Sequence, residues 1–217
     1  MRTTWYDPVA TLAWLCARTE SIRLLSVVLI AAYRHPLLTA SSFGTLAHLT
    51  DERVILGVGA GHVEGEFAAL GVDFDERNEL NDEAIQVLKQ VWTGTGIEME
   101  GRHFRARGNS ALPHPLQQPH PPIWVAARSP ITFDYAVANG CHVMSWPIAR
   151  PFAEAELYKQ QLDASIAASP EAPRPTWALM RHTAVYDSAD QWMVPVEAAQ
   201  QQLSQFENLF KNLGDVQ

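Results

Sequence analysis

The sequence predicts an α/β protein built on a parallel sheet with crossover helices. Apolar, β-branched runs of strand length alternate along the chain with segments of helical periodicity, and the connections that follow the strands are short. The composition agrees, because 47% of the 217 residues are hydrophobic and 18% are charged, as in a globular protein with a sizeable core. This alternation permits two architectures, a closed barrel or a doubly wound sheet.

Five segments are expected to form the parallel strands: 22–30, 54–58, 123–127, 141–146 and 176–186. Helices are expected over 8–16, 36–49, 64–69, 77–92, 130–138, 151–168 and 196–213. The first helix has a clear start, since Asp7 suits the N-cap and Pro8 the first helical position. Residues 97–106 are expected to form a hairpin, and the proline-rich segment 108–121 no regular element. No linker divides the chain, so residues 1–217 are expected to form a single domain.

Composition also argues against several classes of protein. The net charge of −8 argues against nucleic-acid binding, which requires a basic surface. No apolar run reaches the roughly 18 residues of a membrane span, and the N-terminus lacks the apolar core of a secretory signal. Cys16 and Cys141 lie far apart and form no metal-ligand pair, so we expect a reduced, cytoplasmic compartment and no metal site.

In parallel α/β proteins, ligands bind beyond the carboxyl ends of the strands. The strand expected over 54–58 leads into residues 59–62, with glycines at Gly57, Gly59 and Gly61. Bare main chain between a strand and a helix leaves room for a ligand to approach. The spacing differs from the dinucleotide-binding fingerprint, and glycines also serve ordinary tight turns. The residues alone therefore leave a functional and a structural interpretation open.

The strand expected over 123–127 is followed by Arg128, Ser129 and Pro130, with Thr132 one turn further on. Hydroxyl groups and unpaired main-chain N–H groups at a helix N-terminus suit an anion, and Arg128 would add positive charge. The alternative is plain capping, in which Ser129 closes the helix that Pro130 begins.

Three other side chains follow strands and have the chemistry for a site. His35 and His62 are imidazoles that suit acid–base work or, more simply, a hydrogen bond to a loop main chain. Trp146 suits stacking on a flat ring or, more simply, core packing.

Ordered motifs cover roughly residues 5–190: RHP at 34–36, DERVILGVGAG at 51–61, EF at 66–67 with LG at 70–71, FDER at 74–77, EGRHF at 100–104 and PHPPIWV at 119–125. Together they resemble the luciferase-like monooxygenase family, which comprises flavin- or deazaflavin-dependent oxidoreductases related to bacterial luciferase and alkanesulfonate monooxygenase. The resemblance implies a TIM-like (β/α)8 barrel that holds reduced flavin at its C-terminal face.

The resemblance also implies roles for individual residues. Ser129 and Thr132 would bind the flavin phosphate, and Val27 and Val28 would lie under the isoalloxazine ring. The loop that would line the phosphate and the ring consists of Gly59, Ala60, Gly61 and His62. His35 and Trp146 would lie near the ring pocket, with His35 as the candidate catalytic residue.

The function that the resemblance implies is an FMN-dependent monooxygenase that uses reduced flavin and oxygen on a small organic substrate. The segment 181–185 and the glutamine-rich last helix favour this branch over a deazaflavin-dependent dehydrogenase. A third possibility is a non-catalytic flavin-binding protein. A flavin reductase is a candidate partner, and a homo-oligomer is expected.

The chain also departs from the family pattern. It has Ala126, Ala127 and Arg128 where many relatives carry a glycine pair, and His62 where many carry tryptophan. Some members place an arginine at the position of Ala60, and Arg128 would compensate for its absence. The first two strands of the family barrel, and its last strands, have no counterpart. We therefore expect a partial barrel: a fragment, a truncated gene product, or a chain that needs a partner.

Overall fold

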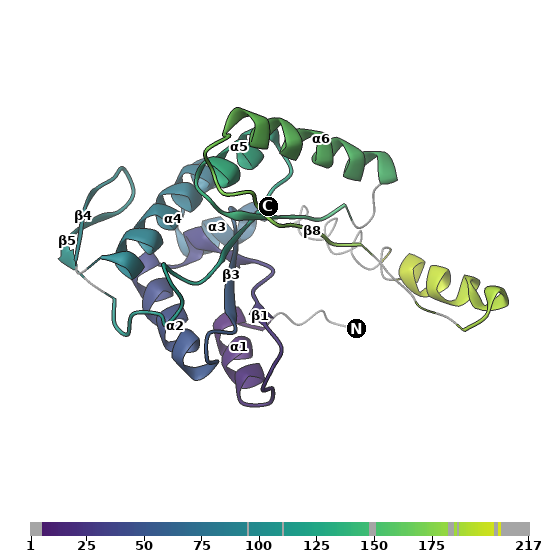
Figure 1. Ribbon diagram of the computed structural model, residues 1–217, viewed down its shortest axis with the longest axis horizontal. Coiled ribbons are helices and arrows are strands. Elements are labelled where there is room, and N and C mark those ends of the chain that lie inside the picture. The colour runs from purple at the N-terminus through teal and green to yellow at the C-terminus, as the bar shows by residue number, and fades with distance from the viewer. Residues whose placement is uncertain are drawn as a thin grey trace.

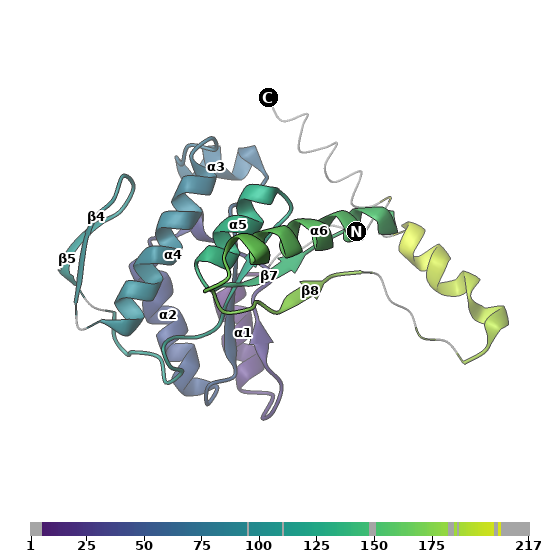
Figure 2. The ribbon, with the colours of Figure 1, turned by 45° about the horizontal axis from the view of Figure 1, so that its top comes forward.

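The structure is a computed structural model that describes residues 6–94, 96–109, 111–147, 151–181, 185, 187–201 and 204. Its main feature is a curled parallel sheet with helices packed along one side (Figures 1 and 2). The strands are β1 (Leu24–Leu25), β2 (Leu29–Ile30), β3 (Val54–Gly59), β6 (Ile123–Ala126), β7 (His142–Ser145) and β8 (Trp177–Leu179).

The strand order follows the order of the chain. One edge of β3 pairs with β1 and β2, the other pairs with β6, and β7 and β8 follow, all in parallel. A doubly wound sheet reverses its strand order at a switch point, whereas a barrel adds each strand on the same side. The structure therefore confirms the predicted α/β fold and resolves the choice of architecture in favour of a partial barrel.

The helices agree closely with the sequence prediction. They are α1 (Pro8–Cys16), η1 (Ala31–Tyr33), α2 (Pro36–Leu49), α3 (Glu64–Leu70), α4 (Arg77–Thr93), α5 (Pro130–Ala138), α6 (Phe152–Ala168) and η2 (Ala189–Gln191), followed by a helical segment over 193–201. The Asp7 side chain caps α1 by accepting a hydrogen bond from the main-chain N–H of Ala10 at 2.9 Å. Residues 182–184 and 186 of the last predicted strand, and 205–213 of the last predicted helix, lie outside the described residues.

Within the described residues, no helix combines the length and the hydropathy that crossing a membrane requires. Within the same ranges, no three His, Cys, Asp or Glu side chains gather in a way that could hold a metal ion.

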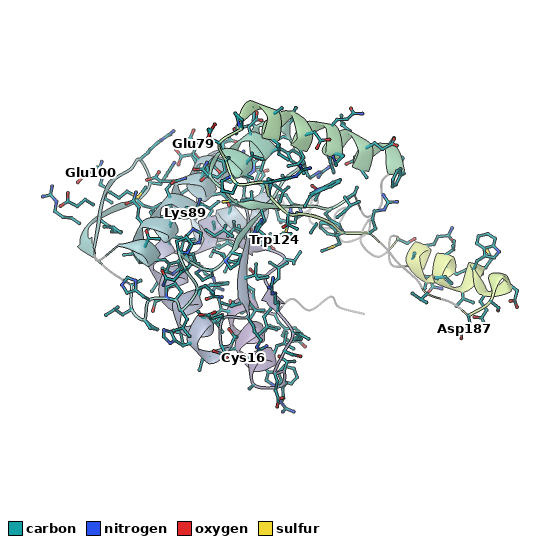
Figure 3. The ribbon with its side chains drawn as sticks, in the orientation of Figure 1. Cys16, Glu79, Lys89, Glu100, Trp124 and Asp187 are labelled. Atoms are coloured by element: carbon teal, nitrogen blue, oxygen red, sulfur yellow. The ribbon has the colours of Figure 1, made fainter. Side chains whose placement is uncertain are left out.

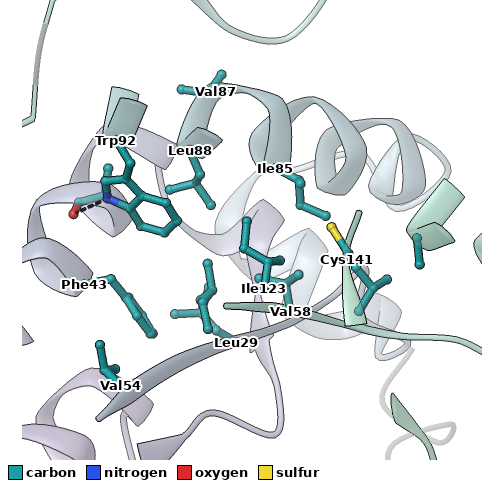
Figure 4. Packing of buried hydrophobic residues seen from close by; sticks show 14 of the residues in the cluster. Leu29, Phe43, Val54, Val58, Ile85, Val87, Leu88, Trp92, Ile123 and Cys141 are labelled. Atoms are coloured by element: carbon teal, nitrogen blue, oxygen red, sulfur yellow. Dashed lines mark hydrogen bonds between the residues drawn. The ribbon is translucent and has the colours of Figure 1, made fainter. Parts of the chain in front are cut away.

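The core fills the space between the sheet and the helices (Figure 4). Val54 and Val58 of β3 and Ile123 of β6 point toward this layer and are buried with Phe43 of α2. The indole of Trp92 closes one end by donating a hydrogen bond to the carbonyl of Ala40 at 3.1 Å. Alternate residues of each strand thus supply the core, and the intervening residues face the concave side of the sheet.

The predicted continuous strand over 22–30 is wrong. The structure divides it into β1 and β2, because the Ser26 hydroxyl takes the place of a ladder partner opposite Gly57. It donates to the Gly57 carbonyl and accepts from the Gly57 N–H, each at 2.9 Å. Between the two strands, the Val27–Val28 peptide is cis.

The glycines of β3 allow this segment to approach closely. A Cβ atom on Gly57 would lie 1.9 Å from the carbonyl oxygen of Ser26, and one on Gly59 would lie 2.9 Å from a methyl group of Val28. Both glycines lie within the strand, which extends one residue beyond the predicted 54–58, rather than in the loop that follows it. Packing inside the protein is sufficient to require them.

The β4–β5 hairpin (Ile97–Glu100 and Arg105–Asn109) lies outside the barrel and docks on α4 through its turn. The carboxylate of Glu83 accepts hydrogen bonds from the main-chain N–H groups of His103 at 3.0 Å and Phe104 at 2.9 Å. Arg102 pairs with Glu79 at 2.5 Å on the surface, where an ion pair contributes little (Figure 3). The carboxylate bound to main-chain groups is therefore the stronger anchor.

The concave side of the sheet carries an aromatic pair. Trp124 and His142 are opposite each other on β6 and β7, and their ring centroids lie 5.1 Å apart (Trp124 is labelled in Figure 3). The Nδ1 atom of His142 accepts a hydrogen bond from the Thr176 N–H at 3.0 Å, so the neutral ring carries its proton on Nε2. Burial lowers the pKa of His142.

Replacing Gly57 by alanine tests the close approach of Ser26. We expect Gly57→Ala to lower the free energy of unfolding by about 2–3 kcal/mol, because the added methyl group meets a main-chain oxygen that cannot move without breaking the sheet. Gly65→Ala is the matched control. No atom lies within 4 Å of its added Cβ, so it should gain about 0.5–1 kcal/mol of helix stability. Urea unfolding measures both, and a neutral Gly57→Ala would contradict the packing described above.

The lowered pKa of His142 predicts a pH dependence of stability. Since the folded-state pKa lies below the ordinary value of 6.5, the unfolded chain binds more protons, and stability declines as the pH falls from 6.5 toward the folded-state pKa. His142→Asn keeps an acceptor near Nδ1 but cannot titrate, so its free energy of unfolding should decline less between about pH 7.5 and about pH 5.5. An equal decline in both proteins would show that His142 does not contribute.

Candidate functional site

The parallel register brings the carboxyl ends of neighbouring strands to one edge of the sheet. Val58 pairs with Val125 near the ends of β3 and β6, and Ala126 pairs with Met144 near the ends of β6 and β7. The segments after these strands, 60–62, 127–132 and 146–147, therefore share this edge. These are the segments in which the sequence predicted a site.

Two hydroxyl groups meet at the first turn of α5. Ser129 occupies the N-cap position in an extended conformation, and Pro130 begins the helix. The Ser129 side chain makes no capping hydrogen bond; its Oγ lies 2.9 Å from Oγ1 of Thr132. Plain capping by the serine hydroxyl is therefore not what the structure shows. A pair of hydroxyls at the positive end of a helix is a suitable environment for an anion.

An open depression of about 750 Å³ adjoins this turn, and its lining residues are Arg128, Ser129, Pro151, Ala153, Glu154, Leu157 and Tyr158. Its lining residues come from the start of α5 and from the beginning of α6, and these two helices pack against each other. Arg128 is exposed, and among the described residues it is the one cationic side chain in this lining. The depression thus combines a cation, a carboxylate, two hydroxyl groups and apolar surface.

Arg128 is held by a chain of hydrogen bonds from α6. Its Nε donates to the Tyr158 hydroxyl at 3.4 Å, and that hydroxyl donates to the carboxylate of Glu154. Burial raises the pKa of Tyr158, the hydrogen bond to Glu154 raises it further, and Arg128 opposes the shift. Tyr158 therefore remains a protonated donor at neutral pH. Sequence reasoning missed Tyr158 and Glu154, because a helical i, i+4 pair gives no sign of which distant arginine it will contact.

The glycine segment lies beside this site and is shaped by α3. Gly59 is buried at the end of β3, Ala60 and Gly61 are half-buried, and His62 is exposed. Gly61 has a positive φ of 90°, and a Cβ there would come within 2.8 Å of the ring of Phe67. The segment is therefore held by packing as well as being accessible to a ligand.

His35 serves as the N-cap of α2. Its Nδ1 accepts a hydrogen bond from the Leu37 N–H at 3.2 Å, and its ring meets Phe104 of the hairpin edge-on at 5.5 Å. The ring is exposed. These contacts supply a structural role for His35, and they fix its neutral ring with the proton on Nε2.

The remaining predicted site residues supply apolar surface. Val27 is 54% exposed and Trp146 is 46% exposed, while Val28 is half-buried against Gly59. Large exposed side chains of this kind suit contact with a flat ligand.

Known proteins are similar to this chain in sequence and fold. A family model described as luciferase-like monooxygenase matches residues 1–214. The oxygenase component of the flavin-dependent trigonelline monooxygenase of Acinetobacter baylyi is 29% identical over 208 residues, which cover 95% of this chain and 58% of that protein. The F420-dependent glucose-6-phosphate dehydrogenase of Nocardia farcinica is 34% identical over 138 residues, which cover 60% of this chain and 40% of that protein.

A solved structure agrees with the sequence relatives. The monooxygenase RslO1 from Streptomyces bottropensis superimposes with a TM-score of 0.80 at 25% identity, over 95% of this chain and 65% of that chain. This chain therefore spans less than two thirds of the length of the proteins that it matches. The sequence relatives, the family model and the shared half-barrel agree on one assignment, and the chain belongs to the luciferase-like monooxygenase family.

Proposed function

We propose that this protein is the flavin-binding part of an FMN-dependent monooxygenase, which acts on a small organic substrate with reduced flavin and oxygen. The observation that carries the proposal is the pair of hydroxyls of Ser129 and Thr132 at the start of α5, with Arg128 next to them. Two hydroxyl donors, a helix N-terminus and a guanidinium are the groups that a phosphate monoester requires. Their chemistry fits the phosphate end of FMN.

The other site residues then have distinct tasks. Val27 and Val28 support the flavin ring, and Trp146 shields it from water. His35 is the candidate catalytic residue, since its Nε2 carries a proton that can be donated. The segment that borders the phosphate and the ring comprises Gly59, Ala60, Gly61 and His62. Reduced flavin, when bound, supplies the electrons that activate oxygen, and the protein binds, orients and shields it.

The trigonelline relative supports a two-component system. That protein is named as an oxygenase component, which implies a separate supplier of reduced flavin. We therefore propose a flavin reductase as partner. We also propose one domain over 1–217, a homo-oligomer, and a cytoplasmic location consistent with the free thiols of Cys16 and Cys141.

Two other functions remain in competition. Deazaflavin-dependent dehydrogenase activity is favoured by the 34% identity with the F420-dependent glucose-6-phosphate dehydrogenase of Nocardia farcinica. A non-catalytic flavin-binding protein is the third candidate. Two measurements distinguish the three functions: the binding of flavins with and without a phosphate, and turnover of a substrate.

Removing both hydroxyls tests the phosphate assignment. We expect Ser129→Ala with Thr132→Ala to weaken FMN binding at least about tenfold, because hydrogen bonds to a charged group are lost, and to leave riboflavin binding unchanged. Quenching of flavin fluorescence measures both affinities. Thr45→Ala, which removes an exposed hydroxyl bonded to its own helix α2, is the control and should bind FMN as the wild type does. Equal losses for FMN and riboflavin would contradict the assignment.

Turnover separates the monooxygenase from its competitors. With chemically reduced FMN and a panel of small organic substrates, oxygen consumption should depend on the protein and on a substrate, whereas reduced F420 should give none. Substrate-dependent reduction of oxidised F420 would instead identify the dehydrogenase. Tight FMN binding without turnover, in the presence of a flavin reductase, would identify the non-catalytic protein.

A further inference from the structure

We infer that Tyr158 and Glu154 are positioning residues that present Arg128 to the phosphate of the bound cofactor, and thereby make the site selective for a phosphorylated flavin. The inference rests on the proposed function and adds to it two side chains outside the motifs of the family resemblance. Three features of the structure support it: the way Arg128 is held, the rigidity of Tyr158 and the location of the depression.

Arg128 is bonded through Nε, and this leaves its other nitrogens for a ligand. Nε donates to the Tyr158 hydroxyl at 3.4 Å, whereas Nη1 and Nη2 donate to no group in the part of the chain that the structure describes. Arg128 lines the depression next to Ser129. A guanidinium fixed at one nitrogen and open at the other two can bind two phosphate oxygens at once.

Tyr158 is rigid enough to act as the anchor. The residue is 3% exposed, and its ring lies 6.0 Å, centroid to centroid, from the fully buried ring of Phe133 on α5. Its hydroxyl donates its single proton to Glu154, one helical turn earlier on α6. The lone pairs of the hydroxyl therefore face Arg128. This fixes the direction of both hydrogen bonds: Arg128 donates to Tyr158, and Tyr158 donates to Glu154.

The hydrogen-bond chain from Arg128 to Glu154 lies where two helices of the fold meet. Residues 128 and 129 adjoin the N-terminus of α5, and Glu154 and Tyr158 lie in the first two turns of α6, which packs against α5. The position of Ala60 cannot supply a cation to the phosphate. An exposed arginine would otherwise sample many rotamers, so a bond to its Nε is what turns a surface charge into a fixed phosphate ligand.

The test compares FMN with riboflavin, which lacks the phosphate. We expect Tyr158→Phe to weaken FMN binding about tenfold and to leave riboflavin binding within about twofold of the wild type. Tyr135→Phe is the matched control: it removes another partly buried tyrosine hydroxyl, bonded to the Asp82 carbonyl, and should not change the ratio of the two affinities. If Tyr158→Phe keeps the wild-type ratio of FMN affinity to riboflavin affinity, the inference is overturned.

A double-mutant cycle separates positioning from general structural damage. If Tyr158 acts through Arg128, Tyr158→Phe should have no further effect on FMN binding in the background of Arg128→Met. Independent, additive losses would refute a positioning role. Glu154→Ala removes the acceptor of the Tyr158 hydroxyl and should weaken FMN binding about as much as Tyr158→Phe does, whereas Glu154→Gln keeps an acceptor and should lose less. No loss in Glu154→Ala, or equal losses in both variants, would refute the role of Glu154 as an acceptor.

Different results would refute the proposed function and the positioning role of Tyr158 and Glu154. If the wild-type chain does not bind FMN, the proposed function fails and the inference fails with it. If FMN binds and the change of Ser129 and Thr132 weakens it, but Tyr158→Phe does not, the phosphate site stands and only the positioning chain is refuted.

Discussion

The Ser26 hydroxyl lies between the two main-chain groups of Gly57 and bonds to both of them at 2.9 Å. This contact pulls the segment between β1 and β2 so close to β3 that Gly57 and Gly59 have no room for a side chain. It also leaves Val27 exposed at that point of the sheet. The break in the first strand, the glycines of the second and the apolar surface proposed to support the flavin ring therefore depend on one buried hydroxyl.

The motifs that carry the family resemblance contribute mainly to the scaffold of the site. Arg53 donates to the carbonyl groups of Thr50 and Ile22, each at 2.8 Å, and so joins the turn before β3 to the segment before β1. Glu83 holds the turn of the EGRHF hairpin through main-chain N–H groups. His35 of the RHP motif caps a helix. These motifs build parts of the scaffold, and the chemistry of a given family member depends on the side chains placed at the carboxyl ends of its strands.

The charge of the protein makes local groups decisive at the candidate site. A net charge of −8 would oppose an anionic cofactor at long range, so the proposed binding of a flavin phosphate would depend on groups in contact with it. The hydroxyl pair of Ser129 and Thr132 and the α5 N-terminus supply neutral donors and a favourable dipole, and Arg128 supplies charge.

The sequence by itself determined the α/β alternation and most of the helix boundaries, because periodicity and caps such as Asp7 are local properties. It could not show that Ser26 would interrupt a strand, because apolar β-branched residues surround it and only the opposing main chain of Gly57 reveals the reason. Nor could it place Tyr158 beside Arg128, which are 30 residues apart along the chain. The order of the strands in the sheet was likewise decided by tertiary structure. Barrel and doubly wound folds share one local pattern of strands and helices and differ only in which strands pair.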